Sequence, residues 1–325
     1  MLIRLSFLLI LIVSALLSFA QGVKKNPDYK PVVDGEWWDI TGNPDLGKYT
    51  SQKQEPVDFG VWQAKDGTWQ LWSCIRGTNA GGKTRLFYRW EGKNLTDRNW
   101  EPKGIAMESD TTLGEEKSGL QAPYVFKENG VYYMFYGDWN NICLAKSEDG
   151  KNFQRVLNDK NTAALFSGPM HNTRDPMVIK IKDTYYCYYS AHLKNNTKDS
   201  GPKGAIFCRT SKNMLDWSEA FEVSKGGTPL SQTRWYAGDI ECPFVVKIKD
   251  KYILFRNHLY GENQMNTQYC SSDPLNFGIN SDEYMVGQIP VAAPEIIKIK
   301  NQYYIVSLKP TLDGIKMAKL KFVKN

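Results

Sequence analysis

Three acidic residues, Asp58, Asp175 and Glu241, stand at matching points of a pattern that recurs along the chain. Carboxyl groups that share a pocket take different roles, because burial and mutual repulsion move their pKa values apart. One then stays protonated as a general acid, and another stays ionised as a base or nucleophile. This pair of roles is what cleavage of an acetal, such as a glycosidic bond, requires. We therefore predict that these three residues form a catalytic set.

The pattern that aligns the acids is a β-hairpin repeated five times. Each hairpin passes through a turn residue, such as Asp66 or Gly130, and returns through aromatic residues, such as Trp69 or Tyr132. Apolar residues alternate along both arms, which is typical of two strands joined by a tight turn. The segments that open the hairpins are Asp58-Phe59-Gly60-Val61, Ala122-Pro123-Tyr124-Val125, Asp175-Pro176-Met177-Val178, Cys242-Pro243-Phe244-Val245 and Ala293-Pro294-Glu295-Ile296.

A third strand is predicted after every hairpin, at residues 84–90, 142–146, 205–210, 267–271 and 315–322. Sheets of this size cannot bury both faces alone, so the five must pack against one another around an axis. The sequence therefore predicts an all-β, five-bladed β-propeller, a single domain over residues 50–325. The last repeat lacks a fourth strand. We expect the N-terminal extension, residues 21–49, to supply that strand from around residues 32–40 and to close the ring.

The rim of the propeller should gather further polar groups around the acids. All first strands of a propeller start at one rim beside the channel, and the second strands end there. The predicted substrate-binding residues at these strand ends are Arg76, Gln121, Asp138, Trp139, Arg174, His192, Asn257 and His258. The remaining histidine, His171, falls at the same rim. Trp37, Trp38, Trp139 and Trp235 are candidates to stack on sugar rings, although a single Trp is more often a packing residue.

Two segments resemble motifs of a known family. Thr173-Arg174-Asp175-Pro176 resembles the Arg-Asp-Pro motif of glycoside hydrolase family 32, whose members cleave fructans and sucrose, and Ile240-Glu241-Cys242-Pro243 resembles the Glu-Cys motif of that family. The hairpin pattern, with its Asp-Pro and Ala-Pro starts, is similar to family 43, the arabinosidases and xylosidases that share the five-bladed fold. The resemblance covers roughly residues 50–322.

The resemblance implies a role for each acid. Glu241 would protonate the leaving oxygen, and Asp58 would act as nucleophile or as base through water. Asp175 would hold sugar hydroxyls and raise the pKa of Glu241. The first blade departs from both families, because Val57-Asp58-Phe59-Gly60 lacks the usual Asp-Pro, so Asp39 is the alternative acid there. The expected substrates are oligo- or polysaccharides of plant or algal type. Arabinofuranosides, fructofuranosides and xylosides all remain open as the bond that is cleaved.

Other functions compete with hydrolysis. A propeller that binds glycan without cleaving it would keep the rim aromatics, and a phosphorylase would need phosphate as co-substrate. Sialidases carry Ser-x-Asp-Gly turns like the one at residues 147–153, but they have six blades, and no Ser-His-Asp or zinc-helix context indicates a protease. We expect no cofactor and no catalytic metal. The central channel is the one place where an ion such as calcium could bind.

The N-terminus predicts export. Arg4 precedes an apolar run over residues 5–17, and Ser18-Phe19-Ala20 is typical of a cleavage site. Residues 1–20 are therefore a predicted signal peptide, and we expect the protein to be secreted or periplasmic. An uncleaved membrane anchor is the alternative. The net charge of +6 comes without a dense Lys/Arg block, which argues against a nucleic-acid partner. We expect a monomer that is not bound to the membrane once the signal peptide has been cleaved.

The six cysteines are singly spaced along the chain, which favours buried free thiols, with one disulfide as the alternative.

Overall fold

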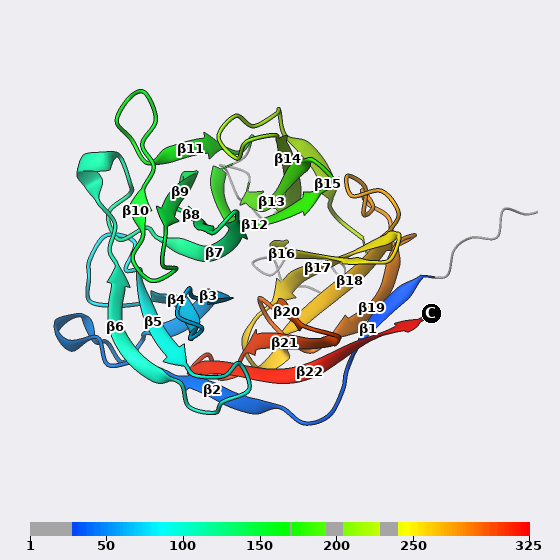
Figure 1. The fold of residues 1–325 in the computed structure, drawn as a ribbon, viewed down its shortest axis with the longest axis horizontal. Helices are drawn as coiled ribbons and strands as arrows, with labels where there is room; N and C mark the ends of the chain where they lie inside the picture. The colour runs from blue at the N-terminus through cyan, green and yellow to red at the C-terminus, as the bar shows by residue number, and fades with distance from the viewer. Residues whose placement is uncertain (1–27, 170, 193–203, 228–239) are drawn as a thin grey trace, which may run out of the picture.

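The structure is a computed structural model that describes residues 28–169, 171–192, 204–227 and 240–325. Five antiparallel sheets stand around a central axis (Figure 1), and the described residues contain 22 strands and three short 3₁₀ helices, Gly47–Tyr49, Thr111–Leu113 and Gly261–Asn263. The predicted all-β, five-bladed propeller is confirmed. No helix in these ranges has the length and apolar character needed to cross a bilayer.

Each blade follows the order of the chain from the channel outward. The first blade comprises β3 (Glu55–Gln63), β4 (Trp69–Arg76), β5 (Leu86–Gly92) and β6 (Glu101–Met107), and the second comprises β7 (Gln121–Glu128), β8 (Val131–Gly137), β9 (Asn141–Ser147), β10 (Gln154–Arg155) and β11 (Ala164–Ser167). The third blade comprises β12 (His171–Ile181), β13 (Thr184–His192), β14 (Gly204–Ser211) and β15 (Phe221–Ser224), and the fourth comprises β16 (Glu241–Ile248), β17 (Lys251–Leu259), β18 (Met265–Ser271) and β19 (Met285–Ile289). The fifth blade comprises β20 (Glu295–Ile299), β21 (Gln302–Leu308) and β22 (Gly314–Lys324).

The two ends of the described chain meet in the fifth blade. β1 (Tyr29–Val33) and β2 (Trp38–Gly42) both pair antiparallel with β22, the last strand of the chain. Figure 1 shows the blue N-terminal strands along the outer edge of the red C-terminal one. These backbone hydrogen bonds close the ring and cover the edge that β22 would otherwise expose.

Aromatic side chains pack the first two blades together. Trp62, Trp72 and Phe153 form a cluster with ring centroids 5.3–5.8 Å apart, and Trp62 Nε1 donates to the Gly150 carbonyl oxygen over 2.7 Å. Near the channel the same blades approach so closely that a Cβ at Gly60 would lie 2.4 Å from the Pro123 oxygen. Only glycine fits that contact. The cysteines, all within the described ranges, are free thiols, as favoured from the sequence, and five of the six are buried.

Candidate active site

The five inner strands begin with the same unusual backbone. The residues at the aligned position all have positive φ: Asp58 35°, Ala122 45°, Asp175 57°, Cys242 47° and Ala293 45°. In the first four blades this position coincides with a shift of register between the first and second strands, which marks a β-bulge. Bulges re-aim a side chain relative to the regular strand. They explain why the side chains at this aligned position face the channel.

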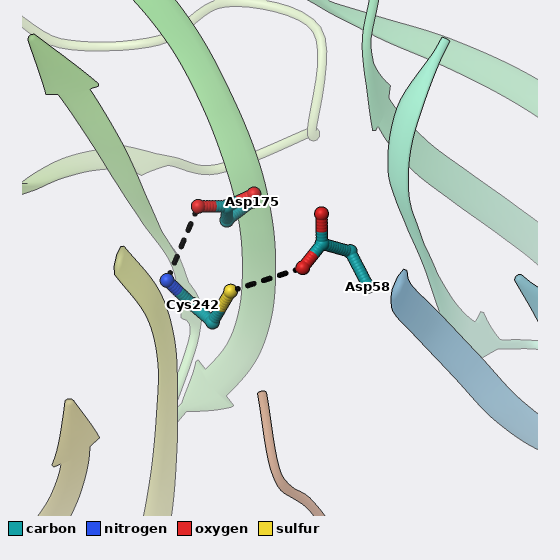
Figure 2. A group of neighbouring side chains, drawn as sticks. All are labelled: Asp58, Asp175 and Cys242. Carbon is teal, nitrogen blue, oxygen red and sulfur yellow. Dashed lines mark hydrogen bonds between the residues drawn. The ribbon is translucent and has the colours of Figure 1, made fainter. Parts of the chain in front are cut away.

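Three of these re-aimed side chains meet in the channel mouth. Figure 2 shows Asp58, Asp175 and Cys242 facing one another from the first, third and fourth blades. The Cys242 backbone N–H donates to Asp175 Oδ2 over 3.1 Å, and its thiol donates to Asp58 Oδ1 over 3.4 Å. Asp58 and Asp175 are both buried. The Ser190 hydroxyl, from the returning strand β13, also donates to Asp175 Oδ2.

Glu241 joins this group from the residue before Cys242. Its Oε1 lies 2.9 Å from Arg174 Nη2, and Arg174 Nε lies 3.6 Å from Asp175 Oδ2, so one guanidinium spans both carboxylates. Its Oε2 contacts the Tyr260 hydroxyl over 2.9 Å. The Glu241 side chain is 14% exposed, whereas those of Arg174 and Asp175 are 5% and 3% exposed. Of the two carboxylates that Arg174 spans, that of Glu241 is therefore the more accessible from outside.

The Tyr260 hydroxyl connects the acids of the first and fourth blades. It lies 3.3 Å from Asp58 Oδ1 and 3.0 Å from Cys242 Sγ, in addition to its contact with Glu241. Burial raises the pKa of Tyr260 well above its usual value, and the negative charge of Asp58 adds to this effect. The hydroxyl therefore keeps its proton at neutral pH. Burial, followed by the charges of Asp175 and Asp58, likewise raises the pKa of the Cys242 thiol.

Burial controls the protonation of both aspartates. The pKa of Asp58 is raised because its carboxylate is removed from water and lies near Glu241; the cations Arg85 and Arg76 pull in the opposite direction. The pKa of Asp175 is raised to about 7, first by burial and then by Asp58 and Glu241, against the lowering effect of Arg174. Carboxyl groups whose pKa values are raised in one pocket are typical of acid–base sites.

Cations of the first blade meet an aromatic ring of the second blade. Arg76 pairs with Glu55 over 2.7 Å. Lys83 Nζ and the guanidinium carbon of Arg85 lie 4.7 and 5.3 Å from the ring centroid of Trp139. Trp139 is half-buried and has a φ of 85°. The ring thus lies just after the end of β8, and cations of the first blade already stack on it.

Four predicted substrate contacts are buried and largely engaged within the protein. Asp138 Oδ1 accepts from the backbone N–H groups of Asn140 and Asn141, which fixes the turn between β8 and β9. Asn257 Oδ1 accepts from the Ala293 N–H and so joins the fourth blade to the fifth. His258 contacts Thr267 through Nδ1, and burial lowers its pKa to about 4, so it is neutral. Gln121, also buried, leaves its Oε1 without a hydrogen-bond partner.

Other candidates lie away from the acids or outside the described part of the chain. Trp38 and Asp39 belong to β2, on the outer edge of the fifth blade, where Trp38 packs on Tyr304 and Asp39 pairs with Lys309. Trp37 stacks under Lys316 of the neighbouring β22. Asp58, and not Asp39, is therefore the first-blade acid that meets the others. The side chains of His171 and His192, and all of Trp235, are not described.

The channel at the acids holds a small cavity of about 40 Å³. Besides Asp58, Asp175 and Cys242, its lining includes prolines, Tyr124, Met177 and Phe244, together with one further carboxyl group, Glu295. Glu295 Oε2 accepts from the Val61 N–H over 2.9 Å, and burial raises its pKa well above the usual value. Calcium takes six to eight oxygen ligands. Among the described residues, the Cys242 sulfur and the apolar lining of this cavity do not match the ligand set that calcium takes.

Sequence reasoning missed Tyr260, Arg85 and Glu295. Tyr260 lies two residues after His258, beyond the end of β17, so extending the predicted rim segment slightly would have included it. Arg85 falls inside the third strand predicted over residues 84–90, away from the strand ends at which rim residues are expected. Glu295 was visible in the repeat, where the other blades place Gly60, Tyr124, Met177 and Phe244.

Comparisons with known proteins agree with the propeller fold. Among solved structures, a thermostable family-43 glycoside hydrolase matches with a TM-score of 0.63 and 18% identity, over 88% of this chain and 92% of that chain. The GH43_1 enzyme from Xanthomonas citri complexed with xylotriose matches with 0.59 and 15%, over 83% and 88%. The endo-arabinase from Bacteroides thetaiotaomicron VPI-5482 matches with 0.60 and 14%, over 87% and 98%. These likenesses show the fold.

A family model establishes the relationship in sequence. A search of curated proteins found no match. The model described as glycosyl hydrolases family 32 N-terminal domain matches residues 64–303, well over half of the chain, and the resemblance to families 32 and 43 is confirmed. The chain is therefore a glycoside hydrolase that belongs to the glycosyl hydrolases family 32 N-terminal domain family.

Proposed function

We propose that this glycoside hydrolase acts outside the cytoplasm, as a secreted or periplasmic monomer, on oligo- or polysaccharides whose terminal sugar is a furanose or a pentose. The observation that carries the catalytic part is the meeting of Asp58, Asp175 and Glu241 around one channel mouth. Asp58 and Glu241 contact the same Tyr260 hydroxyl from different blades, so the two carboxyl groups flank one small space. A pair of carboxyl groups that flanks the scissile bond is what glycoside hydrolysis needs.

Glu241 is the proposed general acid. It is open enough to reach a leaving group, and its proton would pass to the glycosidic oxygen as the bond to the anomeric carbon breaks. Arg174, 2.9 Å from Oε1, would then stabilise the carboxylate that remains. Asp58, across the space, would either bond to the anomeric carbon or take a proton from the water that does so.

Asp175 is proposed to hold the sugar. Its Oδ2 is occupied by the Ser190 hydroxyl and the Cys242 N–H, whereas its buried Oδ1 has no hydrogen-bond partner. A buried acceptor without a donor is costly, and a sugar hydroxyl would supply the donor. Its charge beside Arg174 and Glu241 would help Glu241 to keep its proton.

The substrate class rests on the relatives. Family 32 gives the sequence relationship, and the solved neighbours include an enzyme complexed with xylotriose and an endo-arabinase. These sugars are pentoses or furanoses, and the aromatic Trp139 at the rim would serve a subsite next to the acids. We propose arabinofuranosides, fructofuranosides and xylosides as the substrates to test.

The experiment is a hydrolysis screen of the purified protein. Chromogenic α-L-arabinofuranoside, β-D-xyloside and a fructan are each incubated with the wild type and with Glu241→Gln. We expect release of one sugar by the wild type and its loss in the variant, while binding of that sugar, followed by calorimetry, persists. Absence of hydrolysis across a broad glycan panel, with and without phosphate, would overturn the proposal. Mass spectrometry of protein from the culture medium or periplasm tests export and cleavage after Ala20.

A further inference from the structure

Tyr260 holds a hydroxyl between the two acids that the proposed mechanism uses. Its oxygen lies 3.3 Å from Asp58 Oδ1 and 2.9 Å from Glu241 Oε2. The residue follows β17 directly and begins the 3₁₀ turn Gly261–Asn263 with an extended backbone and no side-chain cap. Its side chain is therefore available to reach the channel mouth. Within the described residues, Tyr260 is the hydroxyl that contacts both Asp58 and Glu241.

The number of hydrogens restricts how these contacts form. A hydroxyl carries one hydrogen, so Tyr260 donates to one neighbour at a time and accepts from another. If it donates to Asp58, the contact with Glu241 must use a hydrogen that Glu241 carries. The geometry thus fits a pair in which Asp58 is ionised and Glu241 is protonated, which is the state that starts the reaction.

The charge moves during the proposed reaction. As Asp58 bonds to the anomeric carbon, or takes a proton from the attacking water, it loses its negative charge. In the same step the glycosidic bond breaks and the proton of Glu241 goes to the leaving oxygen, so Glu241 gains a negative charge. The charge therefore passes from one side of Tyr260 to the other, and a buried charge is stabilised most by a hydrogen bond that points at it.

We propose that Tyr260 is a positioning residue whose single O–H hydrogen bond follows this charge, from Asp58 before bond cleavage to Glu241 after it. The inference rests on the proposed roles of these two acids. Rotation of the O–H bond is the only movement needed, because the oxygen already lies within hydrogen-bond distance of both carboxyl groups. The Cys242 thiol, 3.4 Å from Asp58 Oδ1, remains as a weaker donor to Asp58 after the switch.

The first test uses Tyr260→Phe and leaving groups of different basicity. Removing a hydrogen bond to a charged group should lower kcat about 10- to 100-fold for an aryl glycoside with a poor leaving group such as 4-methoxyphenol. The loss should be much smaller with 2,4-dinitrophenol, which departs without protonation. The acidic limb of the kcat/KM profile should move to higher pH, because Asp58 loses a donor to its ionised form.

Tyr188→Phe is the matched control. Its hydroxyl is also buried and donates to the Pro274 carbonyl over 2.8 Å, away from the acids, so its loss should leave both the pH profile and the leaving-group dependence unchanged. Equal losses of kcat with both leaving groups in Tyr260→Phe, with an unmoved profile, would overturn the proposal. If that variant does not fold, 3,5-difluorotyrosine at position 260, a stronger donor of similar shape, should move the acidic limb to lower pH; no movement overturns the proposal.

A second measurement needs no turnover. In protein labelled with ¹³C at its carboxyl carbons, the Asp58 resonance, assigned through Asp58→Asn, should titrate at higher pH in Tyr260→Phe than in the wild type. Coincident titrations would show that Tyr260 does not donate to Asp58. If the wild type hydrolyses no glycoside, the proposed function fails, while the titration still decides whether this hydrogen bond exists.

Discussion

The inner strands of the second and fifth blades begin with the same backbone as those of the first, third and fourth. Ala122 and Ala293 both have a φ of 45°, close to the values of Asp58 and Cys242. Left-handed residues other than glycine are often taken as signs of a strained active site. Here two of the five carry only a methyl group, so the conformation belongs to the propeller repeat and not to the chemistry.

The difference between the two groups of blades lies in the side chains placed on this shared backbone. Asp58 and Asp175 stand at the bulge itself, and Glu241 stands one residue before it. The second and fifth blades place Gln121 and Ala292 at the position of Glu241. The second and fifth blades, which carry no acid at this position, therefore provide internal controls for the other three, and the four predictions below use them in that way.

Asp58→Asn should have the largest effect. The amide keeps the shape of the carboxyl group but neither attacks carbon nor accepts a proton, so kcat should fall about 100- to 10,000-fold. Ala293→Ser, at the equivalent place in the fifth blade, should change kcat less than about twofold. Steady-state kinetics on the best substrate of the screen decides this. A small loss of kcat in Asp58→Asn would show that another residue acts as the nucleophile or base.

Asp175→Asn should alter the dependence of stability on pH. The folded pKa of Asp175 is about 7, above the usual unfolded value of about 3.9. Between these values the folded chain holds a proton that the unfolded chain has released, so the wild type loses stability as the pH rises through this range. The variant lacks that loss. Its free energy of unfolding should exceed that of the wild type by roughly 2–4 kcal/mol at pH 8 and by little at pH 4.

Urea denaturation at both pH values measures this difference. Ala122→Ser, at the same position of the second blade, should show the same offset from the wild type at pH 4 and pH 8. An Asp175→Asn offset that does not grow between pH 4 and pH 8 would mean that Asp175 titrates normally and is not held near neutrality by burial.

The repeat was predictable from the sequence because two-residue alternation and turn residues are local signals. All five hairpins and third strands lie where they were predicted, within a few residues at their ends. The strand that the N-terminal extension was expected to add to the last blade is present, since β2 pairs with β22, but the sequence does not show that this pairing leaves Trp37, Trp38 and Asp39 on the outer edge, away from the acids. Asp138 and Asn257 are at the predicted rim, but their oxygens bind backbone N–H groups of their own or the next blade. Tyr260 follows the end of a strand, at the repeat position that Arg76 occupies in the first blade, but the sequence does not show that its hydroxyl contacts both acids.

Ala122→Gly and Ala293→Gly should stabilise the protein slightly. A left-handed conformation costs an alanine roughly 1–2 kcal/mol, and glycine removes this cost while losing more chain entropy on folding. The net gain should be about 0.5–1 kcal/mol for each variant, measured by thermal unfolding, with kcat unchanged. A loss of stability would indicate that the methyl groups pack well enough to offset the backbone cost. A change in kcat would contradict the view that this backbone is independent of the chemistry.

Glu295→Gln should have the smallest effect, although it removes a carboxyl group from the channel. Glu295 stands in the fifth blade two residues after Ala293 and lines the same cavity as Asp58 and Asp175. Burial raises the pKa of Glu295 well above the usual value and so favours its neutral form, and glutamine keeps an oxygen that can accept from the Val61 N–H. At pH 7 we therefore expect less than about 1 kcal/mol of change in stability and less than a twofold change in kcat. A larger loss of kcat would show that a carboxyl group need not stand at the bulge to serve the reaction. If kcat is unchanged, the position at the bulge, and not mere presence in the channel, distinguishes the acids of the first and third blades.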